Sequence, residues 1–113
     1  MKVIKSKEAQ KFVRSNSCTV WEYEMADKDI NIATAKISGR HPEQGFSINT
    51  RCKELVFVLG GEGKMIFENQ EIKLEKGDSV LIEPNEKFYL EGNLEISISC
   101  NPAWTLEQYK SVE

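Results

Sequence analysis

The chain has few cysteines, a single histidine and no hydrophobic segment long enough to cross a membrane. Its cysteines, Cys18, Cys52 and Cys100, are odd in number and far apart in the sequence. This spacing does not suit a disulfide framework, so we expect free thiols in a reducing compartment.

A strong charge of one sign is also missing. The net charge is −3, and lysines and glutamates are interspersed rather than gathered in blocks. The basic surface of a nucleic-acid-binding protein is therefore absent. Lysines interrupt residues 1–6 before the apolar core of a signal peptide can form. We expect a cytoplasmic protein that binds neither nucleic acid nor membranes.

The length suits one domain and leaves no room for a second. The chain has 113 residues, of which 40% are hydrophobic. A chain of this size buries roughly two thirds of its unfolded surface, so it needs neither a disulfide nor a metal to fold. We expect residues 1–113 to form a single domain.

The hydrophobic pattern is that of a β protein. Apolar side chains at Leu94, Ile96, Ile98 and Cys100 alternate with polar ones, which is the two-residue period of a strand with one buried face. Further expected strands are 18–23, 30–38, 46–49, 54–59, 64–68, 71–74 and 79–82. Short strands at this spacing, separated by glycine, proline and asparagine turns, predict an all-β sandwich, roll or barrel.

Local signals predict one tight hairpin and two short helical segments. Glycines at 60, 61 and 63 permit the positive φ angles of a hairpin turn. Residues 7–14 are expected to form a turn or two of helix. Thr105 and Gln108 have the spacing of a capping box, which predicts a C-terminal helix over 105–112.

The segment from Glu54 to Leu90 resembles the core of the cupin family. Glu54 is followed by six residues and Gly61, as in the first cupin motif, and Gly77 precedes a hydrophobic strand and Pro84, as in the second. The resemblance covers about residues 33–100, with an N-terminal extension over 1–17 and the C-terminal helix outside it. It implies a double-stranded β-helix, the cupin jelly-roll barrel, and says little about activity because cupins have many functions.

The resemblance also implies a metal site that this sequence lacks. Cupin metal ions are held by three histidines and a glutamate, residue types that suit iron, manganese, nickel or zinc. The histidine positions fall on Ser47, Asn49 and Phe88, and only Glu54 remains. His41 is expected at a surface turn over 40–43. We therefore expect no metal and no other cofactor.

Alternation within the implied barrel predicts a small-molecule pocket. If Glu54 points inward, a mostly apolar pocket with a few polar groups forms around it, which is typical of ligand sites. The expected pocket residues are Ser47, Asn49, Glu54, Val56, Val58, Phe88 and Leu90. Such a pocket suits a small polar, carboxylated or sugar-like molecule. We expect Cys100 to be a core residue. Packing or rim positions are expected for Trp21 and Tyr23. Trp104 is expected to pin the terminal helix.

Two alternatives remain for Glu54. It can pair with Arg40, Arg51 or Lys53 and merely order its strand. If it is desolvated instead, its pKa rises and it can serve as a general acid or base. The chain would then be a metal-independent sugar isomerase, epimerase or lyase, and the sequence leaves open whether it is an enzyme.

The opposite face of the same strands predicts self-association. Side chains that alternate with the inward ones point outward, and five large apolar ones are too many to leave in water. They are Phe46, Ile48, Leu55, Phe57 and Leu59. We expect a homodimer through this face. The alternative is that Phe12, Val13 and the C-terminal helix cover it within one chain.

Overall fold

The computed structural model describes all 113 residues and contains nine β-strands. The strands are β1 (Gln10–Ser15), β2 (Cys18–Tyr23), β3 (Asn31–His41), β4 (Phe46–Asn49), β5 (Lys53–Phe67), β6 (Glu71–Glu75), β7 (Ser79–Ile82), β8 (Phe88–Asn101) and β9 (Tyr109–Val112). Two single 3-10 turns, Ser6–Glu8 and Leu106–Gln108, are the only helical segments. The prediction of an all-β fold is confirmed.

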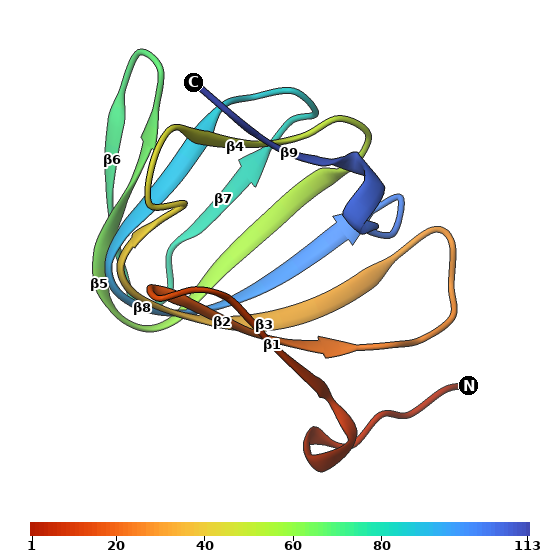
Figure 1. Cartoon of the computed structure of the whole chain (residues 1–113). Helices are drawn as coiled ribbons and strands as arrows, with labels where there is room; N and C mark the ends of the chain where they lie inside the picture. The colour runs from red at the N-terminus through yellow and green to blue at the C-terminus, as the bar shows by residue number, and fades with distance from the viewer.

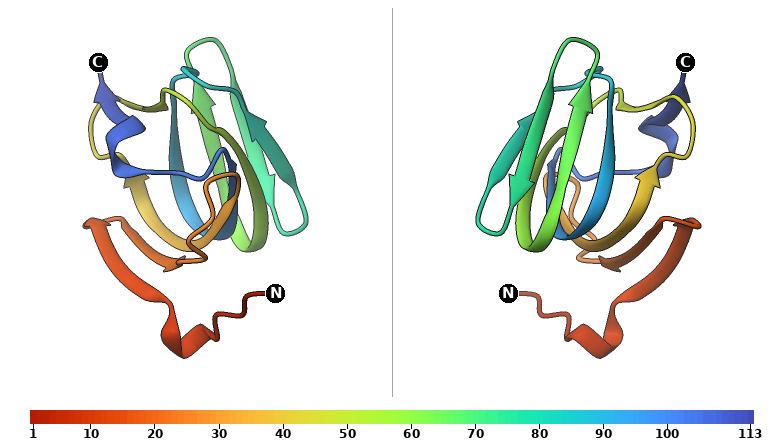
Figure 2. Two further views of the ribbon diagram at one scale, coloured as in Figure 1. Left: turned by 90° about the vertical axis from the view of Figure 1, so that its right-hand side faces the viewer. Right: turned by 90° about the vertical axis from the view of Figure 1, so that its left-hand side faces the viewer.

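The long strand β8 organises the sheet. It pairs antiparallel with β3 along one edge and with β5 along the other, so residues far apart in the sequence lie side by side. Strands follow the order β1-β2-β3-β8-β4-β9, and β5 adds β6 and β7. The sheet curls into an open half-barrel, with the β1–β2 hairpin at one rim and β4 with β9 at the other (Figures 1 and 2).

The hydrophobic core lies on the concave side of β5 and β8. Val56, Val58, Met65 and Ile96 are fully buried there, and they belong to a cluster of 12 buried apolar residues. Burying an aliphatic side chain of this kind stabilises a fold by roughly 1.5–3 kcal/mol. The alternation predicted from the sequence therefore decides which face of each strand becomes interior.

The glycines at 60, 61 and 63 form a bend rather than the hairpin that we predicted. β5 runs through them without a break and stays paired with β8, with a register shift between Val58 and Gly60. Only Gly61 has a positive φ among the three, and a side chain there would collide with the carbonyl oxygen of Asn93. The glycines thus let two long strands curve together without breaking their pairing.

The predicted N-terminal helix is wrong. Residues 7–14 form the end of a 3-10 turn followed by β1, which pairs with β2 in the register Phe12↔Val20. An isolated helix of two turns has marginal stability in water. The β1–β2 hairpin instead extends the sheet, gives the backbone groups hydrogen-bond partners and partly buries Phe12. Tertiary pairing therefore overrides the local helical pattern.

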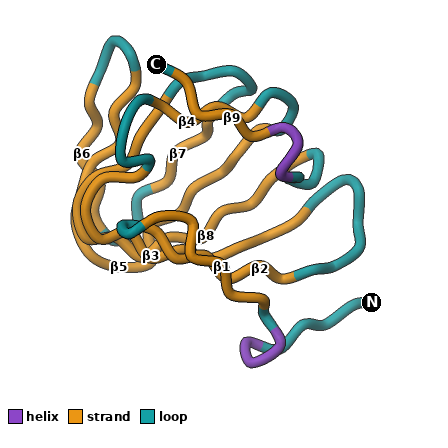
Figure 3. Tube along the Cα trace, in the orientation of Figure 1, coloured by secondary structure: helices purple, strands orange, loops and turns teal.

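The predicted C-terminal helix over 105–112 is also wrong. Only Leu106–Gln108 form a 3-10 turn, and Thr105 makes no side-chain cap. Residues 109–112 form β9, which pairs with β4 in the register Asn49↔Tyr109 (Figure 3). The free edge of β4 supplies backbone partners that a surface helix would leave unused. No helix of the structure is long and apolar enough to cross a membrane.

Candidate functional site

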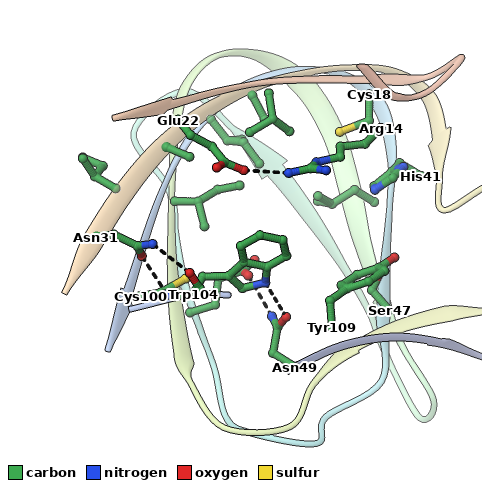
Figure 4. A pocket seen from close by; sticks show the side chains of 18 of the residues that line it. Arg14, Cys18, Glu22, Asn31, His41, Ser47, Asn49, Cys100, Trp104 and Tyr109 are labelled. Carbon is green, nitrogen blue, oxygen red and sulfur yellow. Dashed lines mark hydrogen bonds and ion pairs between the residues drawn. The ribbon is translucent and has the colours of Figure 1, made fainter. Parts of the chain in front are cut away.

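A cavity of about 340 Å³ lies in the mouth of the half-barrel. Its walls come from β1, β2, β3, β4, β5 and β8, and from the segment that carries Trp104 and Tyr109 (Figure 4). Five of the seven residues expected from the sequence line it, namely Ser47, Asn49, Glu54, Phe88 and Leu90. The other two, Val56 and Val58, are buried in the core and do not line the cavity.

Glu54 is the buried carboxyl of this cavity. Its residue is only 7% exposed, and its Oε1 accepts a hydrogen bond of 2.9 Å from Asn49 Nδ2. None of the ion pairs in the structure involves Glu54: Lys53 pairs with Glu83, and Arg40 donates to backbone carbonyls. The structure therefore does not contain the ion pair between Glu54 and a neighbouring cation that the sequence left as an alternative.

Burial dominates the ionisation of Glu54. Desolvation raises the pKa of this carboxyl from 4.5 to about 7, while the hydrogen bond from Asn49 acts in the opposite direction. A group whose pKa lies near neutrality can either donate or accept a proton at physiological pH. Strongly shifted carboxyls in clefts are also candidates for functional groups.

Asn49 links Glu54 to the indole of Trp104. Asn49 Oδ1 accepts a hydrogen bond of 2.8 Å from Trp104 Nε1, while its amide nitrogen donates to Glu54. The backbone of Trp104 is in turn held by both side-chain atoms of Asn31, at 3.0 and 3.1 Å (Figure 4). Trp104 was expected to pin a helix, but it forms a wall of the cavity instead.

The C-terminal segment is fastened by Gln108. This side chain is buried, accepts a hydrogen bond of 2.9 Å from the Cys52 backbone N–H and donates to the Ala103 carbonyl. The following strand, β9, places the Tyr109 hydroxyl 2.8 Å from Ser47 Oγ. Two aromatic side chains, Trp104 and Tyr109, thus stand together at the mouth with ring centroids 6.4 Å apart.

The N-terminal strand contributes a charged pair. Arg14 Nη2 lies 2.7 Å from Glu22 Oε2, and both residues line the cavity (Figure 4). The Arg14 guanidinium also lies over the rings of Phe12 and Trp104, at 4.5 and 5.6 Å from their centroids. This strand, which falls in the expected N-terminal extension, is therefore part of the cavity wall.

His41 does not occupy a surface turn, as we had predicted. It is the last residue of β3, it lines the cavity, and its Nδ1 lies 2.9 Å from Ser15 Oγ. Burial lowers the pKa of His41, Glu43 raises it and Arg14 lowers it. The inward period of β3, Ala35 and Ile37, leads to His41 four residues later. Extending that period would have found it.

All three cysteines are free thiols and are buried. Burial raises the pKa of Cys18 to about 11. A hydrogen bond between the side chains of Cys52 and Cys100 raises the pKa of Cys100 and lowers that of Cys52. Cys100 belongs to the buried face of β8, as expected, and it also lines the cavity.

The residues present do not fit a cupin metal ion. The four positions that the family pattern assigns to ligands, Ser47, Asn49, Glu54 and Phe88, do come together around the cavity. Among them only Glu54 is a carboxylate, and both polar atoms of the Asn49 side chain already bond to Glu54 and Trp104. No cluster of three or more His, Cys, Asp or Glu side chains could hold an ion. A transition metal needs several imidazole, thiolate or carboxylate ligands at one point, and the side chains of these kinds that line the cavity do not converge in that way.

Several cavity residues were missed by sequence reasoning because they lie in the two tails. Arg14 is on β1, and Trp104 and Tyr109 lie beyond the last strand of the barrel core. Their positions depend on long-range pairings, β1 with β2 and β9 with β4, which local patterns do not specify. Tyr23, expected as a packing or rim residue, also lines the cavity.

Comparisons with known proteins agree with this architecture. Residues 38–97 match the family model described as the Cupin domain. The match covers more than half of the chain, which therefore belongs to the cupin family. A comparison with curated protein sequences gives no match.

Solved structures with the same fold are distant in sequence. Pac13 from Streptomyces, described as a nucleoside dehydratase, has a TM-score of 0.89 at 16% identity, over 100% of this chain and 92% of that one. Variants of it with one histidine or tyrosine replaced are solved with uridine. Ectoine synthase from P. lautus has a TM-score of 0.75 at 15% identity, over 100% and 91% of the two chains. The polyketide cyclase RemF from Streptomyces resistomycificus has a TM-score of 0.78 at 10% identity, over 100% of this chain and 86% of that one. At such identities these likenesses establish the fold alone.

Proposed function

We propose that this cupin binds an uncharged, ring-bearing polar molecule of sugar or nucleoside size in the mouth of its half-barrel, without a metal ion. The observation that carries the proposal is a cavity of about 340 Å³ with a buried carboxyl, Glu54, whose one protein hydrogen bond comes from Asn49. Ligand sites of this size are mostly apolar and orient their ligand with a few polar groups. Glu54 is the group that orients the ligand in this proposal.

The charges around the cavity favour an uncharged ligand over a carboxylated one. Arg14 is the one arginine or lysine that lines the cavity, and it is already paired with Glu22 at 2.7 Å. Glu24 and Glu54 add further acidic groups to the lining. An anionic ligand would therefore meet carboxylates and no free cation, and like charges in a confined site are costly.

The aromatic side chains support a ring in the ligand. Trp104 and Tyr109 stand beside each other at the mouth, and Tyr23 lines the same cavity. Aromatic faces of this kind stack on flat or apolar ring faces, while the polar edges of the ligand remain free for hydrogen bonds. Sugars and nucleosides combine both features.

A second candidate function is acid–base catalysis, favoured by the pKa of about 7 for Glu54. In an elimination, a base takes a proton from carbon and an acid gives a proton to the departing hydroxyl, so that water leaves. Among the groups that line the cavity, Glu54 and His41 are the candidates for such steps. Several proteins of the same fold are enzymes, Pac13 and RemF among them. Removal of a proton from carbon is common to elimination and to sugar isomerisation, so glucose and fructose incubated in D2O test this candidate. Catalysis is expected to exchange hydrogen on carbon, and Glu54→Gln is expected to abolish the exchange.

Calorimetric titration with uridine, ribose and glucose tests binding. At least one of these uncharged compounds is expected to bind, and Glu54→Gln is expected to weaken that binding about tenfold, the effect of one lost hydrogen bond. Glu62→Gln, on the exposed face of the same strand, is the matched control and should change nothing. Failure of all three compounds to bind would contradict the proposal.

The same titration tests the ligand's charge. Uridine monophosphate is expected to bind wild-type protein at least tenfold more weakly than uridine, because Arg14 is neutralised by Glu22. Glu22→Gln frees the guanidinium and should reverse this preference. Equal binding of uridine and its monophosphate by the wild-type protein would contradict the assignment of an uncharged ligand.

We also propose that the protein forms a homodimer through an outer apolar patch on β5 and β7. Leu55, Phe57 and Leu59 are 46%, 43% and 42% exposed, and Leu81, the register partner of Leu55, is 53% exposed. Phe46 and Ile48 are half-buried on β4, which pairs with β8 and β9 rather than with β5. The N-terminal segment pairs with β2 and does not cover the patch.

Sedimentation equilibrium at low micromolar concentration is expected to give twice the mass of one chain. Phe57→Ser should give a monomer, because it removes a large apolar side chain from the centre of the patch. Ile30→Ser is a control at an exposed apolar residue outside the patch, and it should leave the dimer intact. A monomeric wild-type protein would contradict the proposal.

A further inference from the structure

His41 is fixed by a residue of the N-terminal hairpin. It ends β3, and its Nδ1 lies 2.9 Å from the hydroxyl oxygen of Ser15, the last residue of β1. The ring stands on the cavity wall near Arg14 and Cys18, across from Asn31 and Trp104 (Figure 4). The chain has no other histidine, so any property of an imidazole in this protein belongs to this site.

The hydrogen bonds around Ser15 favour one position for the proton of the His41 ring. Ser15 Oγ already accepts a hydrogen bond of 3.1 Å from the Ser17 backbone N–H. A hydroxyl has one hydrogen to donate, and His41 Nδ1 is the one acceptor that the structure gives it. In the arrangement that uses this hydrogen, Ser15 donates to Nδ1. A neutral imidazole that accepts at Nδ1 carries its proton on Nε2.

The second ring nitrogen is available to a ligand. Nε2 has no hydrogen-bond partner in the protein, while no fully buried side-chain nitrogen or oxygen is left without one. Nε2 is therefore not fully buried, and the ring that carries it lines the cavity. No carboxylate bonds to Nε2, so the Ser15–His41 pair lacks the third member of a hydrolytic triad.

We propose that His41 is a fixed, neutral hydrogen-bond donor that offers Nε2–H to a carbonyl or hydroxyl oxygen of the ligand, and that Ser15 is the positioning residue that selects this tautomer. The recognition role rests on the proposed binding function, whereas the tautomer does not. The proposal gives the β1–β2 hairpin a part in ligand recognition, and it narrows the ligand to molecules that present an oxygen acceptor on the His41 side of the cavity.

The electrostatic surroundings keep this imidazole uncharged. Burial lowers the pKa of His41, and the charge of Arg14 on β1 acts in the same direction. Glu43, in the turn after β3, acts in the opposite direction and is outweighed. At neutral pH the ring is therefore a donor through one nitrogen and an acceptor through the other, rather than a cation.

Nitrogen-15 NMR of the histidine ring tests the tautomer on the whole protein without any ligand. At neutral pH the wild-type spectrum is expected to show a protonated Nε2 and an unprotonated Nδ1. Ser15→Ala should give a mixture of the two tautomers, and Ser15→Thr, which keeps the hydroxyl, should restore the wild-type spectrum. Ser79→Ala, at an exposed position of β7, is the control and should have no effect. A proton on Nδ1, a charged ring, or a Ser15→Ala spectrum identical to wild type would overturn the proposal.

A uridine titration followed by the same spectra tests the recognition role. The Nε2 resonance is expected to move on binding, and Ser15→Ala should weaken binding about tenfold, the effect of one hydrogen bond. Uridine that binds and leaves Nε2 unmoved would overturn the recognition role. Failure of uridine, ribose and glucose to bind at all would instead count against the proposed function, and the ligand-free tautomer result would still stand or fall by its own spectra.

Discussion

Replacing Glu54 by glutamine is expected to stabilise the protein by about 3 kcal/mol at mildly alkaline pH and to change its stability little in acid. Glutamine has nearly the same shape and keeps an oxygen that can accept the hydrogen bond from Asn49 Nδ2. What it removes is the ionisation of a carboxyl that is only 7% exposed. A gain of stability from a substitution inside a proposed binding site is typical of a group retained for function.

The sign of this effect follows from the two states of the chain. In the folded protein the pKa of Glu54 is raised from 4.5 to about 7 by burial. Between these two values the unfolded chain has released the proton and the folded chain still holds it. Folding stability therefore falls as the pH rises through this window, and it is greatest below it. The glutamine variant has no such proton and escapes the loss.

Urea denaturation across the window measures the effect. The difference in unfolding free energy between Glu54→Gln and wild type should be near zero below the window and should grow to its full value above it. Taking the difference cancels the contributions of the other carboxyls. Glu62→Gln, on the exposed face of β5, should show a small difference that does not depend on pH. A flat difference for Glu54→Gln would contradict the assigned burial.

Replacing Asn49 by alanine is expected to have the opposite effect and to destabilise the protein by about 2–4 kcal/mol. Asn49 is 5% exposed and bonds to two neighbours, as donor to Glu54 and as acceptor from the Trp104 indole. The truncation leaves a buried carboxyl without its partner and removes packing volume. The pKa of Glu54 should also rise further, because the bond that holds it down is lost.

A double-mutant cycle separates these contributions. Asn49→Ala and Glu54→Ala should not be additive, because each removes one partner of the same hydrogen bond of 2.9 Å. Asn69→Ala, in an exposed turn, is the matched control and should cost less than about 0.5 kcal/mol. Additive effects in the cycle would show that Asn49 and Glu54 do not act on each other.

The sequence was sufficient for the fold because strand alternation and turn residues agree along the whole barrel core. The series from Leu94 to Cys100 and the strand after Glu54 have one buried face, as the two-residue period requires. The cupin resemblance adds the topology, which periodicity alone does not specify. The glycine bend was misread because Gly61 permits either a hairpin or a bulge, and only the pairing with β8 distinguishes them.

The residues of the cavity were only partly predictable, because some of them lie on segments that long-range contacts place. Residues on the barrel strands, such as Asn49, Glu54 and Phe88, follow from alternation and surround the cavity. Arg14 and Trp104 reach it through segments placed by long-range contacts, with Gln108 and Asn31 as the fastening groups. A short segment that looks helical by itself becomes a strand when a sheet edge is free beside it.

Carbon-13 NMR titration of the Glu54 side-chain carboxyl tests the central claim most directly. The resonance is identified by its absence in Glu54→Gln, and its midpoint reports the ionisation of this one group in the folded protein. A midpoint of about 7 is predicted, because the carboxyl is enclosed with Asn49 as its hydrogen-bond donor. A midpoint at the ordinary value of 4.5 would mean that water reaches the carboxylate freely, and it would contradict the proposed site.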